Sequence, residues 1–557
     1  MSKLQFIRAM LAFGLALITQ PVIAAPSGSF DPSFDFDGIQ RGTQQIPRAM
    51  ALQADGKILS AGVPLSPQGD IVAVTRLNTD GSLDASFGNS GIVTTDIVAS
   101  IRDQANAISV QPDGKIVVAG VATEPVNPWH NHFLVIRYNA DGTLDPSFGN
   151  GGIVQTYVSD YDEAHAVAIQ PDGRILVAGT AYTIGPRDDF ALARYNPDGT
   201  LDATFGIGGI VTLNFGVDRY GAGIRDTLVD MALQPDGRIV LAGKTVDPVN
   251  YDMELALARY NPDGSLDATF GAGGTVITDL GANTPDYLTS MALQPDGRIV
   301  VAGYTSLPAN DTVLVRYNTD GSLDASFGAG GIVIPPVSPS ADSAADVAIQ
   351  PDGRIVTAGN SWDQANSRFD IAVLRFNSNG MLDPGFGTGG IALNNPSIWS
   401  HYPSAMVLQP DGRIVVSVRE TWHGGSNYYV ARLFGSPAAV PDLKANGRDE
   451  PLRMIAGGLL DVTASLVPDV YLGQPADYWV HASSPSGQYW YSPNGNWRLS
   501  PTPLRTYAGP LMDLAPRSVL NTTTLPAGVY TITFSVDNNM DGVMDETWSN
   551  SVQVTIQ

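Results

Sequence analysis

The phrase QPDGRI recurs along most of this chain, and its spacing constrains the fold more than any other feature. It begins seven times, at Gln53 (as QADGKI), Gln111, Gln170, Gln234, Gln294, Gln350 and Gln409. A second phrase, of the type LDxSFG, also occurs seven times, at Phe30 (as FDPSFD), Leu83, Leu144, Leu201, Leu266, Leu323 and Leu382. A tandem repeat of about 60 residues predicts that each unit folds as one supersecondary element.

One unit, residues 164–211, indicates what that element is. Two apolar runs, AHAVAIQ and RILVAG, flank a PDG turn, and a third run, DFALARYN, precedes a second PDG turn and a fourth run that ends in GGIV. Short runs rich in Val, Ile and Leu with Gly and Asp at the joints predict four antiparallel strands. No segment of the unit has helical spacing over a helical length. Because several runs are apolar at consecutive positions, both faces of each sheet should be covered, as in the blades of a β-propeller.

The repeat region begins and ends at unexpected points within this unit. It opens on a fourth-strand phrase, GSFDPSFDFDGI at 28–39, and stops after a third strand, YYVARLF at 428–434. A ring explains this offset, because the N-terminal strand then completes the last blade and no sheet edge is left unpaired. We therefore predict an all-β chain whose main part is a seven-bladed β-propeller closed by the N-terminal strand.

The repeated phrase QPDGRIVVAG…RYNPDGSLDATFGAGG resembles the delta-60 repeat of bacterial exported proteins. The resemblance covers about residues 28–435. It implies a β-propeller fold and export from the cytoplasm. It implies no particular activity and no set of catalytic residues, and the first and last repeats depart from the pattern, as terminal repeats often do.

The N-terminal residues 1–25 are typical of a signal peptide. Lys3 and Arg8 provide positive charge beside the apolar run AMLAFGLALI (9–18), and small residues follow in PVIAA (21–25). The apolar run is shorter than the roughly 20 residues that a membrane helix needs, so we expect no membrane span. The protein should be exported, and either a periplasmic or an extracellular location fits.

Two further segments follow the signal peptide. Residues 26–435 contain the repeats and are expected to form the propeller. Residues 436–557 begin with a linker and continue with short alternating runs such as ADYWVHASS and GVYTITFSVD. This spacing favours a small β-sandwich of the immunoglobulin-like class, without the Cys pair.

Composition excludes several classes of partner and chemistry. The formal net charge of −24 argues against nucleic acid and anionic membranes, since both require a basic surface. The chain has no Cys, which excludes disulfides, thiolate zinc sites and cysteine nucleophiles. The remaining partners are an extracellular glycan or protein, and nothing in the sequence specifies the oligomeric state.

Recurrence separates framework from function, because a catalytic group is normally needed only once. An Arg recurs in every third strand, at Arg76, Arg137, Arg194, Arg259, Arg316, Arg375 and Arg432. An Asp recurs in every LDxSFG phrase, at Asp31, Asp84, Asp145, Asp202, Asp267, Asp324 and Asp383. We predict one framework ion pair between these two groups in each blade.

Residues that do not recur are candidates for function. Alternating strands place both PDG turns of a unit on one face and the variable loops on the opposite face. Aromatic residues and His collect in those variable loops, and the candidate ligand-binding residues are Trp129, His130, Tyr161, Trp362, Trp399, His401, Trp422 and His423. Exposed aromatic residues on irregular loops above a rigid ring are typical of a ligand surface. The alternative is that they fill gaps between the loops and the sheets.

These observations favour an exported, non-catalytic binding or scaffold protein whose variable face binds a glycan or a protein. The alternative function is a polysaccharide-acting hydrolase or lyase with its site on the same face. DYDEAH supplies Asp160, Asp162, Glu163 and His165, and RETWHGG supplies Glu420 and His423. Paired carboxylates suit glycosidic chemistry, and His beside carboxylates suits a base, but neither stretch has the spacing of a known catalytic motif. A purely structural surface protein is the third alternative.

The stretch DNNMDGVMDETW, at 537–548, resembles a calcium loop in part. The metal candidates Asp537, Asn539, Asp541 and Asp545 occupy positions 1, 3, 5 and 9 of such a loop, with Gly at position 6. Trp548 replaces the usual Glu at position 12, and strands are expected on both sides instead of helices. The stretch is therefore either a Ca²⁺ loop or a long polar hairpin, and no other cofactor is implied.

Overall fold

The structure is a computed structural model of the whole chain. It describes residues 27–435 except 36, 42–44, 66–70, 98–101, 125, 128–129, 184–186, 218–222, 282–284, 307–309 and 423–424, and then the strands between residues 440 and 556. The chain divides into a unit that spans Pro26–Ser436 and a second unit that contains Pro437–Gln557. The signal-peptide prediction falls on residues outside the described part.

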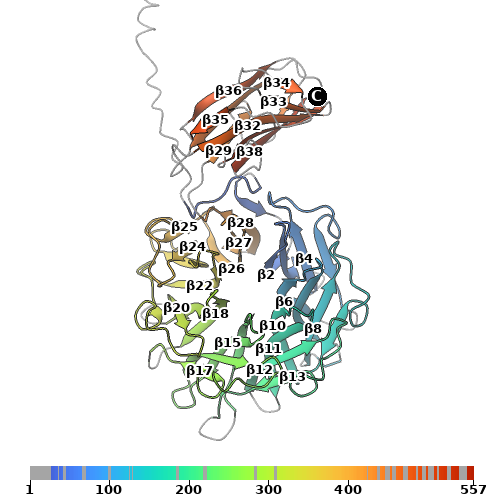
Figure 1. Cartoon of the computed structure of the whole chain (residues 1–557), viewed down its shortest axis with the longest axis vertical. Helices are drawn as coiled ribbons and strands as arrows, with labels where there is room; N and C mark the ends of the chain where they lie inside the picture. The colour runs from blue at the N-terminus through green and yellow to red at the C-terminus, as the bar shows by residue number, and fades with distance from the viewer. Residues whose placement is uncertain are drawn as a thin grey trace, which may run out of the picture. The chain divides into compact units, whose positions relative to one another are not determined.

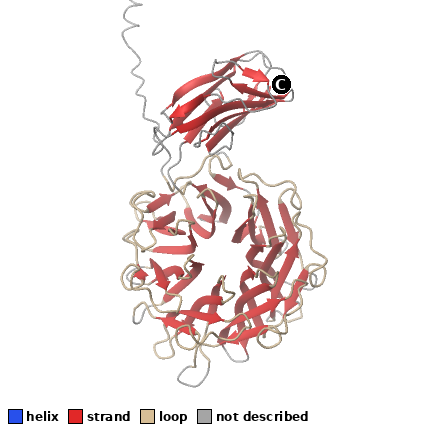
Figure 2. Cartoon of the chain, in the orientation of Figure 1, coloured by secondary structure: helices blue, strands red, loops and turns tan. Residues whose placement is uncertain are grey.

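The described residues form strands and turns and contain no helix (Figure 2). Each sheet of the repeat region has an inner, a second, a third and an outer strand. The inner strands are β2 (Gln45–Leu52), β6 (Arg102–Val110), β10 (Tyr161–Ile169), β14 (Thr227–Leu233), β18 (Asp286–Leu293), β22 (Asp342–Ile349) and β26 (Ser400–Leu408). The second strands are β3 (Ile58–Pro64), β7 (Ile116–Thr123), β11 (Ile175–Thr183), β15 (Ile239–Val246), β19 (Ile299–Thr305), β23 (Ile355–Asp363) and β27 (Ile414–Trp422).

The other two strands of each repeat lie further from the centre. The third strands are β4 (Val72–Leu77), β8 (Asn131–Tyr138), β12 (Arg187–Tyr195), β16 (Met253–Tyr260), β20 (Asp311–Tyr317), β24 (Arg368–Phe376) and β28 (Gly425–Leu433). The outer strands are β5 (Ile92–Thr95), β9 (Ile153–Thr156), β13 (Ile210–Leu213), β17 (Thr275–Thr278), β21 (Ile332–Val333), β25 (Ile391–Asn394) and β1 (Ile39–Arg41).

These strands pair into antiparallel sheets in chain order, for example β14-β15-β16-β17 and β22-β23-β24-β25. Between β8 and β10, Tyr161 pairs in parallel with Asn131 and so joins the sheets of two neighbouring repeats. Each inner strand contacts the inner strand of the next repeat, and β26 contacts β2. The sheets therefore surround a common axis with their inner strands closest to it (Figure 1).

The N-terminal strand β1 belongs to the sheet of the last repeat. Its Ile39 lies opposite Ala431 of β28, and Phe30 forms an antiparallel bridge with Leu433. The resulting sheet has the order β1-β28-β27-β26, so the first strand of the repeat region stands in the outer position that the last repeat does not supply itself.

The hydrophobic core lies between neighbouring sheets. Every residue of β7 is buried, because its sheet is covered on both faces, and this explains the consecutive apolar residues of IVVAG. Tyr138 of β8 is fully buried, and its hydroxyl lies 2.6 Å from the Oγ1 of Thr95 in the preceding repeat. Tyr195 and Tyr317 make the same contact to Thr156 and Thr278.

The recurring Arg joins each repeat to the next. In Arg76, Nε donates to Asp84 at 2.8 Å, the guanidinium lies 4.5 Å from the centre of the Phe87 ring, and Nη1 donates to the Ala140 carbonyl in the following repeat. The predicted ion pair recurs between Asp and Arg in all seven positions. Nη1 of Arg432, the last of them, donates to the carbonyl of Thr79 in the first repeat.

The C-terminal unit consists of strands in two sheets. Its strands are β29 (Val440–Ala445), β30 (Leu452–Met454), β31 (Leu460–Val467), β32 (Pro475–Ser484), β33 (Gly487–Tyr491), β34 (Trp497–Leu499), β35 (Tyr507–Pro510), β36 (Leu514–Thr522), β37 (Gly528–Asp537) and β38 (Trp548–Ile556). One sheet has the order β29-β31-β36, and the other has β30-β38-β37-β32-β33-β34, with β35 also paired to β32. Within the described part of the chain, no helix has the length and apolar character needed to span a membrane.

Candidate functional site

The antiparallel pairing sorts the loops of each repeat onto two faces. The two PDG turns of a repeat join its inner to its second strand and its third to its outer strand, so they share one face. The loops from second to third strand, and from outer strand to the next inner strand, share the opposite face, which we call the variable face.

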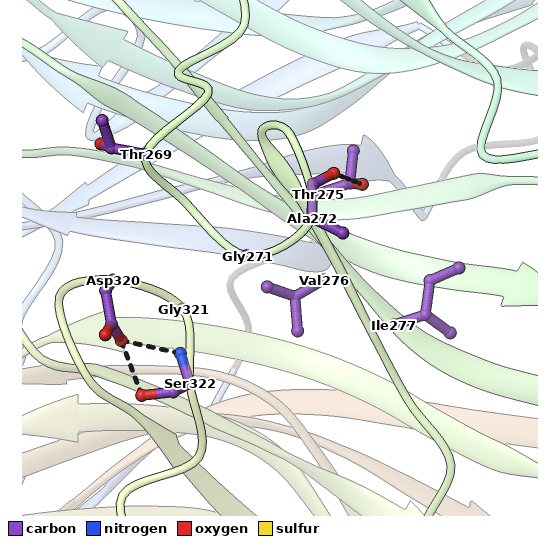
Figure 3. Close-up of a pocket in the computed structure, with 9 residues that line it drawn as sticks. All are labelled: Thr269, Gly271, Ala272, Thr275, Val276, Ile277, Asp320, Gly321 and Ser322. Carbon is purple, nitrogen blue, oxygen red and sulfur yellow. Dashed lines mark hydrogen bonds between the residues drawn. The ribbon is translucent and has the colours of Figure 1, made fainter.

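The PDG face carries pockets made by its own repeated turns. One pocket, of about 420 Å³, is lined by Thr269, Gly271, Ala272, Thr275, Val276, Ile277, Asp320, Gly321 and Ser322 (Figure 3). Oδ1 of Asp320 accepts hydrogen bonds from the Ser322 amide at 2.9 Å and from its hydroxyl at 2.6 Å. The same turn recurs at Asp80, Asp141, Asp198 and Asp263. This pocket is a groove between framework turns.

The variable face holds an aromatic cluster at the last two repeats, made of Trp362, Phe369, Tyr402 and Arg419. The ring centres of Trp362 and Phe369 are 4.9 Å apart, and those of Phe369 and Tyr402 are 5.3 Å apart. The Arg419 guanidinium lies 5.1 Å from the centre of the Tyr402 ring and is itself exposed. The cluster therefore spans two neighbouring sheets and contains one of the predicted ligand residues, Trp362.

Two other predicted residues, Trp399 and Trp422, belong to the last repeat and the loop before it. Trp399 is 36% exposed and follows Ile398, which is 74% exposed. The Trp399 amide donates to the Ser397 hydroxyl at 3.1 Å, which fixes the loop that carries both side chains. Trp422 ends β27, and its ring packs over Gly425 of its own hairpin, where a Cβ would lie 2.9 Å from the indole.

His401 corrects one expectation. The sequence places it in an exposed loop, but it is the second residue of β26 and is fully buried. Its Nδ1 lies 2.9 Å from the Tyr429 hydroxyl, and its Nε2 lies 3.2 Å from the hydroxyl of Ser397, which donates to Glu420 at 2.5 Å. Burial lowers the pKa of His401, so the imidazole is held as a neutral group.

His401 occupies a framework position that sequence reasoning missed. The residue eight places before each QPDG glutamine lies at or next to the first residue of the inner strand, and the set is Gln45, Asp103, Asp162, Asp226, Asp286, Asp342 and His401. All seven are buried. The carboxylates accept backbone N–H groups of the preceding loop, as Asp162 does from Val158 at 2.7 Å and Ser159 at 2.8 Å. Asp162, a catalytic candidate by sequence, therefore anchors a loop.

A second group of polar residues, which we call the His–Tyr cluster, lies where the second repeat meets the third. It comprises Glu124, His130, His132, Tyr157 and Asp160. Nε2 of His132 lies 2.8 Å from Oε1 of Glu124. In His130, Nδ1 lies 3.7 Å from Oε2 of Glu124 and Nε2 lies 3.9 Å from Oδ1 of Asp160. The Tyr157 hydroxyl donates to Oδ1 of Asp160 at 2.7 Å.

Tyr161 stands beside the His–Tyr cluster. It is 38% exposed, and the centre of its ring lies 6.5 Å from that of Tyr182. Among the described residues, no group of three or more His, Asp or Glu is arranged to hold a metal ion.

Several predicted residues lie outside the described part. Trp129 and His423 are two of them, and three of the calcium candidates, Asn539, Asp541 and Asp545, are the others. The fourth calcium candidate, Asp537, is the last residue of β37.

Comparisons with known proteins support the repeat fold and supply no function. Six segments match the family model described as "Domain of unknown function (DUF5122) beta-propeller", at residues 53–87, 111–148, 170–205, 234–270, 294–327 and 350–386. These matches place the repeats in a β-propeller repeat family. No curated protein matches the chain.

Three solved structures resemble the chain at low identity. An unknown function protein from Dyadobacter fermentans is 11% identical with a TM-score of 0.39, and 59% of this chain and 94% of that chain are covered. An endo-arabinase from Bacteroides thetaiotaomicron is 9% identical with a TM-score of 0.27, and the match covers 59% of this chain and 94% of that chain. A hypothetical protein from Leishmania major is 12% identical with a TM-score of 0.26, and the match covers 59% of this chain and 83% of that chain. At these scores the likenesses carry no argument about function.

Proposed function

We propose that this chain is an exported, non-catalytic binding or scaffold protein that binds a glycan or a protein partner through its variable face. In this proposal residues 26–435 form a closed seven-bladed propeller of the delta-60 type. The C-terminal unit is an immunoglobulin-like β-sandwich.

Contacts between the two ends of the repeat region support the closed ring. β1 pairs with β28, β2 contacts β26, and Arg432 donates to the carbonyl of Thr79. The last contact is the one that each earlier Arg makes to the next repeat. A ring in which the same Arg–Asp pair, which we call the staple, joins each sheet to the next is a rigid support. Binding residues usually lie in loops on such a rigid support.

The observation that carries the binding proposal is the difference between the two faces. On the PDG face the repeated polar groups bond to each other, whereas on the variable face single-copy aromatic residues gather at the last two repeats. Trp362, Tyr402 and the exposed Trp399 supply apolar ring surface. The guanidinium of Arg419 is exposed and supplies several N–H donors. Aromatic residues and Arg are the side chains that dominate binding hot spots, for protein partners and for the apolar faces of sugars.

Screening the mature protein on glycan and protein arrays tests this proposal. We expect the triple variant Trp362→Ala, Trp399→Ala, Trp422→Ala to lose about 2 kcal/mol or more of binding free energy for any ligand found, as hot-spot truncations do. Ile207→Ala is the matched control, because Ile207 is 91% exposed on the PDG face. If the triple variant binds every ligand as the parent protein does, the variable face is not the binding surface.

One observation favours the alternative, a polysaccharide-acting hydrolase or lyase. Glu163 and His165 of DYDEAH lie on inner strand β10, where the Nδ2 of Asn106 donates to Glu163 at 3.1 Å. A carboxylate and an imidazole on one strand are an acid and a base. Product release from a polysaccharide that Glu163→Gln abolishes, with fold and thermal stability unchanged, would establish the alternative. Binding without product formation favours the main proposal.

A further inference from the structure

Tyr287 and Tyr304 form a stacked pair of rings that does not recur in the other repeats. They lie directly opposite each other on inner strand β18 and second strand β19, their ring centres are 4.7 Å apart, and their ring planes differ by 17°. Both side chains are partly buried, and neither hydroxyl makes a hydrogen bond to a residue in the described part of the chain. The recurring Tyr195 and Tyr317 differ in this respect, because their hydroxyls bond to Thr. The two hydroxyls are therefore available to a ligand.

Lys244 of β15, in the preceding repeat, completes this group, which we call the Lys–Tyr cluster. Its Nζ lies 5.3 Å from the centre of the Tyr287 ring, and β15 contacts β18. The side chain is partly buried, and its ammonium has neither an ion pair nor a hydrogen bond to a described residue. Burial lowers the pKa of Lys244. A partly buried ammonium without an anion carries a desolvation cost that an anionic group of a ligand can offset.

The Lys–Tyr cluster occupies a register that the framework leaves open. In each sheet, the residue after the buried position of Asp286 or His401 lies opposite a residue of the second strand. The seven pairs are Ile46–Val63, Gln104–Val121, Glu163–Thr180, Thr227–Lys244, Tyr287–Tyr304, Ser343–Asn360 and Tyr402–Arg419. The second-strand member is buried in the first three pairs and at least partly exposed in the last four. Because these residues differ in every repeat, the fold does not require a cation or a Tyr there.

Neutral hydroxyl and amide groups accompany the cluster in this register. Thr227 lies opposite Lys244, and in the next sheet the Nδ2 of Asn360 donates to the Ser343 hydroxyl at 3.0 Å. That sheet contacts β19 through β22. The last four pairs contain no carboxylate. Hydroxyl and amide groups donate and accept hydrogen bonds as sugar hydroxyls do, and Tyr rings offer apolar surface, so this chemistry favours a sugar over a peptide.

We propose that Lys244, Tyr287 and Tyr304 bind a sugar residue that carries a carboxylate, as in a polyuronate. Lys244 donates a charge-assisted hydrogen bond to the carboxylate, and the Tyr hydroxyls bond to hydroxyls of the sugar. The net charge of −24 does not prevent this contact, because salt screens exposed charges that are further away than about 8–10 Å. The site goes beyond the proposed function, since it specifies a ligand chemistry and shares no residue with the aromatic cluster.

Isothermal titration calorimetry of the full mature protein with matched probes tests the proposal. The probes are trimers of galacturonate, glucuronate and mannuronate, each as the free acid and as the methyl ester. The two forms of a trimer have the same sugars and linkages and differ in the charge of the carboxylates. We expect at least one trimer to bind about tenfold or more tightly as the acid than as the ester, because only the acid gives Lys244 an anionic partner.

Variants assign this preference to the Lys–Tyr cluster. Lys244→Met keeps the aliphatic stem and should weaken binding of the acid about tenfold while leaving binding of the ester unchanged. Lys244→Arg should keep the preference for the acid. Tyr287→Phe and Tyr304→Phe keep the rings and should each weaken both forms about threefold, since each removes one neutral hydrogen bond. Arg41→Met removes an exposed cation of β1 and, as the control, should bind both forms as the parent protein does.

Three results overturn the proposal. The first is absent binding, or equal binding of acid and ester, for all three trimers. The second is a preference for the acid that Lys244→Met leaves intact. The third is triglutamate that binds more tightly than every trimer and depends on Lys244, which would identify an acidic peptide as the ligand. Because these readouts do not involve Trp362, Trp399 or Trp422, failure here leaves the proposal for the aromatic cluster standing.

Discussion

At the residue scale, one position shows how the same place in the fold accepts different chemistry. The buried register at the start of each inner strand is Asp in five repeats, Gln45 in the first and His401 in the last. Burial raises the pKa of Asp162, Asp286 and Asp342, and it raises that of Asp226 from 3.8 to about 7. The neutral side chains at the two ends of the series indicate that charge is not what this position needs.

The pH dependence of stability follows from this register. The pKa of Asp226 is about 7 in the folded protein, compared with 3.8 for an ordinary Asp side chain in the unfolded chain. Between about pH 4 and 7 the folded protein therefore keeps a proton on Asp226 that the unfolded chain has already lost. Stability therefore falls as the pH rises through this window. We expect Asp226→Asn to remove about 3 kcal/mol of this fall between pH 5 and 8, since stability changes by about 1.4 kcal/mol per pH unit between pH 5 and 7. Urea unfolding at several pH values measures it, and a slope identical to that of the parent protein contradicts it.

At the element scale, the Arg–Asp pair acts as a staple between sheets. The sequence predicts the pair from its recurrence, but it does not predict that Nη1 reaches the next repeat or that the guanidinium covers a Phe ring, because both contacts lie between sheets. The loop-anchoring register was also overlooked. Its offset of eight residues from QPDG is constant, as for Asp162 and Gln170. The loop before it varies in length from repeat to repeat, so the equivalent residues are not recognised when the repeats are compared from their preceding phrase.

Breaking one staple should be costly. Arg194 is 7% exposed, and its Nη2 lies 2.9 Å from Asp202. Arg194→Leu leaves the buried Asp202 carboxylate with the partly exposed Arg174, whose Nε lies 3.0 Å away, as its remaining cationic partner. We therefore expect a loss of about 3 kcal/mol in the free energy of unfolding, the lower end of the range for breaking a buried ion pair. Arg41→Leu breaks the exposed pair with Asp37 and should cost less than about 1 kcal/mol. Similar losses for both variants, measured by urea unfolding, would show that the staple adds nothing.

The second strands need glycine for a related reason. A Cβ at Gly303 would lie 1.8 Å from the Tyr287 carbonyl of β18, so β18 and β19 would have to separate. We expect Gly303→Ala to lower the unfolding free energy by about 2–4 kcal/mol, the range of strained core substitutions. Gly353→Ala, at a turn glycine with open space around it, controls for backbone conformation alone. If the two variants unfold alike, close strand approach is not what glycine provides at 303.

At the scale of the whole molecule, sequence and structure agree on repeated four-stranded sheets and differ in what they say about the site. The repeat phrase predicts the sheets because strand and turn chemistry is local. The site is not local, since Phe369, which packs against Trp362, meets Tyr402 across two sheets. His401, eight residues before Gln409, is buried by contacts with Ser397 and Tyr429. Side-chain identity alone did not distinguish a surface His from a buried one.

Ring closure has a direct chemical test, because the chain contains no cysteine of its own. Ile39 of β1 lies opposite Ala431 of β28. Residues directly opposite in an antiparallel pair have Cα atoms about 4.5–5.5 Å apart, within the range that a disulfide spans. The double variant Ile39→Cys, Ala431→Cys should therefore form an intramolecular disulfide in nearly every molecule under mild oxidation. By joining the ends of the ring, the bond should stabilise the protein by up to about 5 kcal/mol.

Non-reducing electrophoresis and thermal unfolding with and without reductant measure both effects. Ile39→Cys with Ala256→Cys is the control, since Ala256 lies in β16, away from β1, and should remain reduced. Two free thiols in the Ile39, Ala431 variant after oxidation, or an unfolding temperature that reductant does not lower, would mean that β1 leaves β28 in solution and that the ring is open. Because each staple holds only one junction, an open ring would also free the edge of β28 for pairing with other chains.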